Sequence, residues 1–397
     1  MRFEKVAIPL GLSWSSPFCR WQGALSDVSS VDLAVDVTAR ALRARELDVH
    51  DITYLALGST VPQATSFYGA TTVAPRLGLD AVTGPAVAQA CATSAAVVQT
   101  AATQIELGAH RTALAVATDR TSNGPVMLYP SGTAAGGAPQ VEHWVLDPMK
   151  YDPNTGHSMV DTAEFVAAEE GYTRSEIDDV TLLRYEQYRS ALADDRAVQR
   201  RYLVDVHVPA RRVVVVIAED QGVHATTAEG LAKLAPARPD GVVTFGSQTH
   251  PGDGTAGLVL DTLEAARAHS AGEGVARLLA VSFARVERAR MPKAPMPAAR
   301  AALADAGLTV ADLDVVTTHN PFAVNDLYFS RQTGFPLERM NPYGCSLVYG
   351  HPQGPTGLRA IAELIEALRA RGGGRGLFTG CAAGDTAGAV VVEVGDR

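Results

Sequence analysis

The chain has 397 residues, of which 47% are hydrophobic and 19% are charged, and its formal net charge is -9. This length and balance predict an ordinary globular α/β protein of two or three domains, and the negative charge argues against nucleic acid as a partner. No apolar stretch reaches the ~18 residues that a membrane span requires, and residues 1–11 lack the pattern of a signal or transit peptide. We therefore expect a cytoplasmic protein without membrane contact.

The first informative segment surrounds Cys91. The extended apolar run PAVAQA is followed by ACATSAAVVQTAATQIELGAH, which contains no proline and reaches a stop signal at Gly108. This pattern predicts a strand, a tight turn and a helix over 92–107, with Cys91 at the helix start. The free N–H groups and the helix dipole there favour a thiolate, so we expect a lowered pKa for this cysteine. Taken alone, however, an unpaired cysteine is more often a small apolar filler.

From about Asp119 to Ser247 the pattern changes. An irregular loop, a charged helical region and the strand-like run ARRVVVVI separate the first half from the run VVTFGSQTHPGDGTAGLVL, which completes it. The sequence therefore predicts an inserted segment. Arg211 and Arg212 within it are weak evidence for a phosphate site, and we interpret them as the solvated edge of a strand.

A second segment repeats the order found around Cys91. After LVYGHP, which contains His351, the sequence LRAIAELIEALRARGGG predicts an amphipathic helix, and the strand GLFTG then leads to Cys381. The repeat indicates an internal duplication of a strand–helix–strand unit with chemical groups at equivalent turns. A histidine before a proline is usually structural. Beside two thiols it becomes a candidate base, because a thiol needs a nearby imidazole to give up its proton.

The four cysteines are few for the length and show no metal-type spacing. They are Cys19, Cys91, Cys345 and Cys381. This usage predicts reduced thiols in a reducing compartment and no metal site.

These motifs resemble the thiolase family, and the resemblance runs nearly from end to end. Besides QACATSAAV and YGHPQGPTGLR, the matching stretches are WQGALSDVSSVDLA, DRTSNGP, MVDTAEFVAAEEGYTRSEID, TTAEGLAKLAPARPDGVVTFGSQTHPGDGTAGLVL, MPKAPMPAARAALADAGLTVADLD and THNPFAVND. Each stretch alone is weak, but in this order and at these spacings they are highly specific.

The resemblance implies an α/β thiolase fold, with a duplicated five-layered α-β-α-β-α arrangement and an inserted loop domain. The N-terminal half would comprise residues 1–118 and 248–268, the loop domain over the active site 119–247, and the C-terminal half 269–397. It implies no permanently bound cofactor, and coenzyme A thioesters as substrates, so that acyl-CoA and CoA are the expected ligands. It also implies a homodimer or homotetramer, with an accessory subunit as a further possibility.

The resemblance assigns catalytic roles as well. Cys91 matches the nucleophile that takes the acyl group, His351 the histidine that activates it, and Cys381 the second cysteine, which moves the proton of the α-carbon. Two thiols are needed because Claisen chemistry requires an acid/base apart from the acylated nucleophile. His351 with His319 would stabilise the enolate oxygen. The backbone N–H groups of Cys91 and of Gly384 or its neighbour would stabilise the tetrahedral adduct.

The resemblance also places four residues at the substrate: Met159, Met291, Thr249 and Phe322. The two methionines match an acyl site and Thr249 a pantetheine contact, although methionine is also an ordinary core filler. Val160 and His250 replace glycines of the family pattern, so we expect them to reshape the entrance and the thioester channel.

Several positions depart from the family pattern. His319 stands where many thiolases have asparagine. Gly384 comes one residue late after Cys381, so the second oxyanion donor is shifted or supplied by Ala383. Cys345 adds a third thiol near the site, and we interpret it as packing.

The leading functional hypothesis is an acyl-CoA C-acyltransferase that cleaves a 3-ketoacyl-CoA or condenses two acyl-CoA units. The alternative is a divergent thiolase-like subunit of a larger complex that binds acyl-CoA with weak activity of its own. A decarboxylating ketoacyl synthase is a third hypothesis, but those enzymes lack the second cysteine. Intact Cys91, His351 and Cys381 favour the first.

Overall fold

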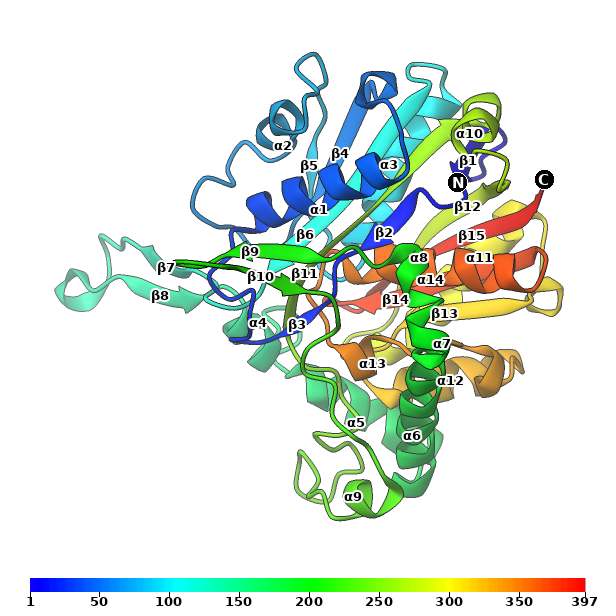
Figure 1. Cartoon of the computed structure of the whole chain (residues 1–397). Coiled ribbons are helices and arrows are strands. Elements are labelled where there is room, and N and C mark those ends of the chain that lie inside the picture. The colour runs from blue at the N-terminus through cyan, green and yellow to red at the C-terminus, as the bar shows by residue number, and fades with distance from the viewer. Residues whose placement is uncertain (397) are drawn as a thin grey trace.

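The computed structural model describes residues 1–396 and contains a central sheet of eleven strands (Figure 1). The main path through it is β13-β14-β15-β12-β1-β11-β6-β4-β5, and β2 and β3 pair with β11 beside that path. The strands of this sheet are β1 (Val6–Pro9), β2 (Ser13–Ser15), β3 (Cys19–Arg20), β4 (Tyr54–Gly58), β5 (Ala86–Val87), β6 (Thr112–Arg120), β11 (Gly252–Thr262), β12 (Val275–Arg285), β13 (Val315–His319), β14 (Gly374–Ala382) and β15 (Thr386–Asp396).

Strand β1 joins the two halves of this sheet. Ala7 lies opposite Asp261 of β11 on one side and opposite Arg277 of β12 on the other, and both pairings are antiparallel. The two halves are therefore continuous through the N-terminal strand.

Five helices form three layers with the central sheet, among the fourteen α-helices of residues 1–396. The fourteen are α1 (Ser30–Ala44), α2 (Ala70–Arg76), α3 (Thr93–Glu106), α4 (Leu146–Lys150), α5 (Met159–Glu170), α6 (Arg174–Ala191), α7 (Ala193–Arg196), α8 (Gln199–Tyr202), α9 (Ala228–Ala232), α10 (Leu263–His269), α11 (Pro295–Ala306), α12 (Ala323–Thr333), α13 (Ser346–Tyr349) and α14 (Thr356–Ala370). Helices α3 and α14 pack between the two halves of the sheet, α1 and α2 cover the outer face of one half, and α11 covers that of the other.

The strand sequences explain these layers. Along β6, Leu114 and Val116 point to the cluster that includes α1, whereas Ala113 and Ala115 point to the cluster that includes α3 and α14. Successive side chains of a strand face opposite sides, so a strand that is apolar throughout is covered on both faces. The α/β fold with five alternating layers is confirmed.

The predicted duplication is visible in the strand pairing. Strands β4 and β6 are parallel and frame α3, and β13 and β14 are parallel and frame α14. The observed helix Thr93–Glu106 agrees with the predicted helix over 92–107. The strand before it is shorter than expected, since only Ala86–Val87 pairs with β4.

The residues between β6 and β11 lie outside the central sheet (Figure 1). They form helices α4 to α9, the hairpin of β7 (Val126–Tyr129) with β8 (Gln140–His143), and the hairpin of β9 (Val206–Pro209) with β10 (Val214–Ile217). Arg211 and Arg212 are exposed at the turn of the second hairpin. The limits 119 and 247 of a separate loop domain stay a prediction. Within residues 1–396, no helix is both long and apolar enough to cross a bilayer.

Candidate active site

Four candidate residues meet where the two duplicated units converge. Cys91 lies just before α3, and His351 lies five residues before α14 begins. His319 is the last residue of β13, and Cys381 lies next to the end of the neighbouring strand β14. The paired strands and helices thus bring side chains together that are up to 290 positions apart in the sequence.

Cys91 and His351 form a hydrogen-bonded pair. The distance from Cys91 Sγ to His351 Nε2 is 3.0 Å, and His351 Nδ1 lies 2.7 Å from Thr356 Oγ1. When the thiol donates to Nε2, the neutral ring carries its hydrogen on Nδ1 and donates it to Thr356. Nucleophile, base and orienting group are therefore all within hydrogen-bond reach. Thr356 had no predicted role, although it follows the GHPQGP motif directly.

The lowered pKa that we expected for Cys91 is wrong. Burial raises the pKa of this thiol to about 12, and the backbone amides of Ala383 and Cys91 oppose the shift only in part. Desolvation penalises the charged form more than the local dipoles favour it. Burial, with smaller contributions from His319 and His250, holds the pKa of His351 well below its usual value. The resting pair is therefore a neutral thiol beside a neutral imidazole, and the proton moves when the nucleophile attacks.

His319 stacks on His351, with ring centroids 3.9 Å apart and an interplanar angle of 19°. Its Nδ1 lies 3.0 Å from Ser346 Oγ, and its Nε2 is buried without a hydrogen-bond partner. Burial lowers the pKa of His319 to about 3, so the ring is neutral. With Ser346 donating to Nδ1, Nε2 carries an N–H that is free to bind a ligand oxygen.

Cys381 is fully buried and accepts a hydrogen bond from Asn325 Nδ2 at 3.2 Å. Burial and the nearby Cys91 sulfur raise the pKa of this second thiol well above its usual value. Asn325 had no predicted role, although it lies in the stretch THNPFAVND.

The backbone after Cys381 makes a turn in which Gly384 has a φ of 80°. Ala383 lines the cavity, and its backbone amide acts on the Cys91 thiol, whereas Gly384 is not among the residues that line it. Of the two donors considered, the structure therefore favours Ala383.

The side chains of Cys91, His319, His351 and Cys381 open into one cavity of about 290 Å³, here called the catalytic cavity. Its apolar lining includes Val145, Leu146, Met149, Met159, Val160, Phe245, Pro251, Met291, Pro321 and Phe322, and its polar lining includes Gln248, Thr249, His250 and Gln353. All four predicted substrate residues thus line the catalytic cavity. In the described part of the chain, Cys91, His319 and His351 also have ligand atoms within 4.8 Å of one another, a spacing that can hold a metal ion.

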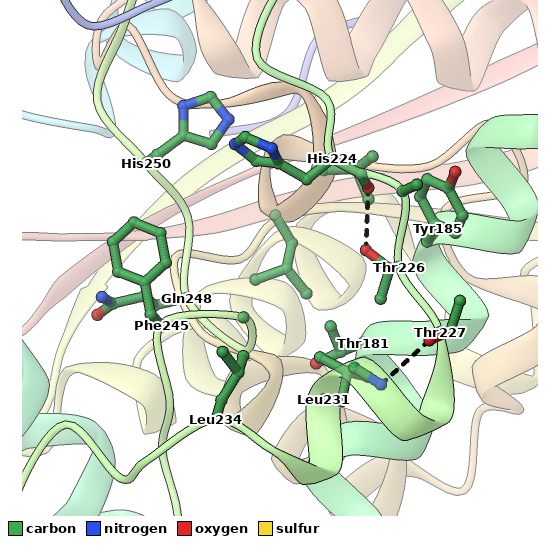
Figure 2. Close-up of a pocket in the computed structure, with 15 residues that line it drawn as sticks. Thr181, Tyr185, His224, Thr226, Thr227, Leu231, Leu234, Phe245, Gln248 and His250 are labelled. Atoms are coloured by element: carbon green, nitrogen blue, oxygen red, sulfur yellow. Dashed lines mark hydrogen bonds between the residues drawn. The ribbon is translucent and has the colours of Figure 1, made fainter.

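A second hollow of about 360 Å³ adjoins the catalytic cavity and shares Phe245, Gln248 and His250 with it (Figure 2). Its other walls come from α6, from the loop 224–227, from α9 and from residues 347–348, and they carry several hydroxyl groups. Within the described chain, neither hollow is lined by lysine or arginine. A long ligand can leave the catalytic cavity along this polar side.

Comparisons with known proteins agree with this geometry. The family models for the thiolase N-terminal domain and the thiolase C-terminal domain match residues 13–264 and 273–394. Acetyl-CoA acetyltransferase of Escherichia coli (strain K12) is 30% identical over 380 residues, which cover 94% of this chain and 95% of the relative. Beta-ketoadipyl-CoA thiolase of Pseudomonas knackmussii is 30% identical over 382 residues, covering 92% of this chain and 94% of that protein.

Solved structures show the same similarity. The crystal structure of Bacillus anthracis acetyl-CoA acetyltransferase matches with a TM-score of 0.91 and 29% identity, over 99% of both chains. Human mitochondrial 3-ketoacyl-CoA thiolase in complex with CoA matches with a TM-score of 0.90 and 23% identity over 99% of both chains, which shows the shared fold.

Proposed function

Because the chain belongs to the thiolase family, we propose that it is an acyl-CoA C-acyltransferase that works through an acyl-enzyme on Cys91. The single observation that carries the proposal is the 3.0 Å contact between Cys91 Sγ and His351 Nε2 on the wall of the catalytic cavity. The same cavity holds Cys381, so an acid/base stands beside the nucleophile without being part of it.

Acylation begins when His351 Nε2 takes the proton of Cys91 and the sulfur attacks the thioester carbonyl. The negative oxygen of the tetrahedral adduct accepts from the backbone N–H groups of Cys91 and Ala383. As the adduct collapses, the bond to the CoA sulfur breaks, and the departing thiolate receives the proton held by His351. The reaction is balanced, because one thioester replaces another.

The second half-reaction uses Cys381. In condensation, Cys381 first passes its proton to the neutral His351, and the resulting thiolate removes an α-proton from a second acyl-CoA. The enolate attacks the Cys91 thioester, and the displaced Cys91 sulfur takes the proton held by His351. In thiolytic cleavage, the order is reversed and Cys381 returns the proton to the departing carbanion. The free Nε2 of His319 is suited to donate to the enolate oxygen, since it is buried and has no partner in the resting site.

The cavity walls support a division of the substrate. The methionine side chains of the lining suit the apolar acyl group, and Gln248 and His250, which also line the second hollow, suit the amide-containing pantetheine arm. Since no lysine or arginine of the described chain lines either hollow, the phosphates of CoA would have to bind to cations outside them.

The proposal is tested by incubation with an acyl-CoA and peptide mass spectrometry. We expect the acyl group on the peptide QACATSAAV, and loss of labelling in Cys91→Ser, which keeps the shape but weakens the nucleophile. Cys345→Ala is the matched control, because Cys345 is buried outside the cavity lining. Stable acylation of Cys345 or Cys381 in the unmodified protein would contradict the proposal.

The roles of the two thiols are separated by Cys381→Ala. This variant should acylate Cys91 in a single turnover but lose cleavage and condensation, because the carbanion has no proton partner. His351→Ala should impair acylation itself. Near-normal cleavage by Cys381→Ala would show that another group transfers the α-proton.

A further inference from the structure

The turn behind His351 is tied to two segments of the N-terminal half. The N–H of Gly354 donates to Asp119 Oδ2 at 2.8 Å, and the carbonyl oxygen of Gly354 accepts from Ser94 Oγ. Asp119 belongs to β6, and Ser94 is the second residue of α3, three positions after Cys91. We call Asp119, Gly354 and Ser94 the latch. It fixes the turn behind the base relative to the helix behind the nucleophile.

The latch is closely packed. A Cβ atom on Gly354 would lie 2.6 Å from Asp119 Oδ2, so only glycine lets the turn approach the carboxylate this closely. The preceding Gln353 has a φ of 56°, an uncommon conformation for a residue with a side chain. Ser94 Oγ also accepts from the N–H of Leu358 at 2.8 Å, which extends the contact into α14.

The Asp119 carboxylate is fully buried and is held by uncharged donors. It accepts from the N–H groups of Thr60 and Val61 at 2.8 and 3.0 Å, from Thr60 Oγ1 at 2.8 Å and from Ser59 Oγ at 3.1 Å, besides Gly354. Burial raises its pKa to about 6. Burying a carboxylate without a cation beside it costs free energy of folding. Its position between three segments of the site therefore indicates a role there.

We propose that Asp119 is a positioning residue for acyl transfer, which holds the turn behind His351 so that the imidazole meets the Cys91 thiol. The inference rests on the proposed acyl transfer and extends it. Asp119 is not among the residues that line the catalytic cavity, so it acts through Gly354 and not on the substrate.

Positioning and charge make opposite predictions for this residue. The Asp119 carboxylate contributes to the raised pKa of the Cys91 thiol, so its charge alone disfavours the thiolate. If charge were its main effect, removing it would speed acylation. If Asp119 sets the geometry of the base, removing it slows acylation.

The test is single-turnover acylation by an acyl-CoA. Asp119→Asn keeps the size but turns an acceptor oxygen into an NH₂ group, which cannot accept from the surrounding N–H groups. We expect the acylation rate to fall about 30- to 100-fold, since small misplacements of reacting groups cost this much. The half-saturating concentration should stay unchanged. Asp261→Asn, in a buried aspartate at the far end of β11, is the matched control and should change the rate less than about twofold.

A second variant and the pH dependence of acylation distinguish positioning of the base from a general structural defect. Ser94→Ala removes the other end of the latch and should slow acylation about 3- to 10-fold, the equivalent of one hydrogen bond. In the unmodified protein, acylation should decline as the pH falls through about 6, where Asp119 takes up a proton. Asp119→Asn should lack this decline. The Asp119 carboxylate raises the pKa of the Cys91 thiol. The groups at 59–61 and at 354 that donate hydrogen bonds to Asp119 are all uncharged.

The outcomes are distinguishable. Unchanged or faster acylation in Asp119→Asn would overturn the inference, and if that variant does not fold, normal acylation by Ser94→Ala overturns it. Failure of the unmodified protein to acylate Cys91 with any acyl-CoA would instead contradict the proposed function.

Discussion

Arg359 in α14 is the centre of a buried ionic network. Its guanidinium donates to both oxygens of Asp220, at 2.6 and 2.8 Å, and to Glu363 at 3.0 Å. It also lies 3.6 Å from the ring centroid of Tyr349 and 4.8 Å from that of Phe18. The side chains of Arg359 and Asp220 are 0% exposed. We predict that Arg359→Met strongly destabilises the protein.

The size of the loss follows from the partners that remain. Removing one member of a buried ion pair typically costs about 3–5 kcal/mol, because the other charge is left without compensation. Asp220 keeps hydrogen bonds from the Phe18 N–H and the Tyr188 hydroxyl, and Glu363 keeps those from Tyr202 and Tyr349. These donors place the expected loss near the lower end, at about 3 kcal/mol.

The assay is equilibrium urea unfolding at one protein concentration, since the stability of an oligomer depends on concentration. Adding Asp220→Asn and Glu363→Gln to Arg359→Met should recover at least half of the loss, because both uncompensated charges are removed. The control is Arg111→Met, whose exposed contact with Glu264 should be worth less than about 1 kcal/mol. A loss below about 1 kcal/mol for Arg359→Met, or no recovery in the triple variant, would refute the reasoning.

Three further predictions concern other features. Because burial lowers the pKa of His319 to about 3, the unfolded chain binds a proton below about pH 6.5 that the folded chain does not. The protein should therefore lose about 2 kcal/mol relative to His319→Asn between about pH 7 and about pH 5, measured by urea unfolding, and parallel curves would contradict this. Cys345→Ala should leave single-turnover acylation within about twofold, since it removes a buried packing side chain outside the cavity lining, and a larger loss would give Cys345 a role. Light scattering should return a dimer or tetramer, because β5 is at the free edge of the sheet, and a 41.7 kDa monomer at micromolar concentration would count against it.

The sequence was most informative where chemistry and local pattern coincide. Cys91 and His351 stand beside glycine-marked turns and helical patterns, so both their elements and their pairing could be predicted. The run GLFTG before Cys381 likewise predicted the strand that is observed as part of β14. Such signals come from residues close together in the sequence, so they can be recognised without knowing which strands pair.

What could not be predicted depends on distant segments. The sequence places Cys91 at a helix start, but the burial that raises the pKa of its thiol comes from the whole fold. Asn325 carries no motif of its own, and its contact with Cys381 joins residues 56 positions apart in the sequence. Asp119 lies near the end of β6, and its hydrogen bond to Gly354 joins residues 235 positions apart. Such contacts leave no periodic trace in a single sequence.

The bridging position of β1 has a consequence for how the chain folds. Residues 6–9 pair with strands that begin at residues 252 and 275. During synthesis, strand β1 must therefore wait unpaired until β11 and β12 have emerged from the ribosome. Contacts of such high sequence separation slow folding and expose apolar strands in the meantime. The N-terminal half released by truncation before β12 would leave one edge of β1 open, which makes it an aggregation-prone fragment instead of an independently folding unit.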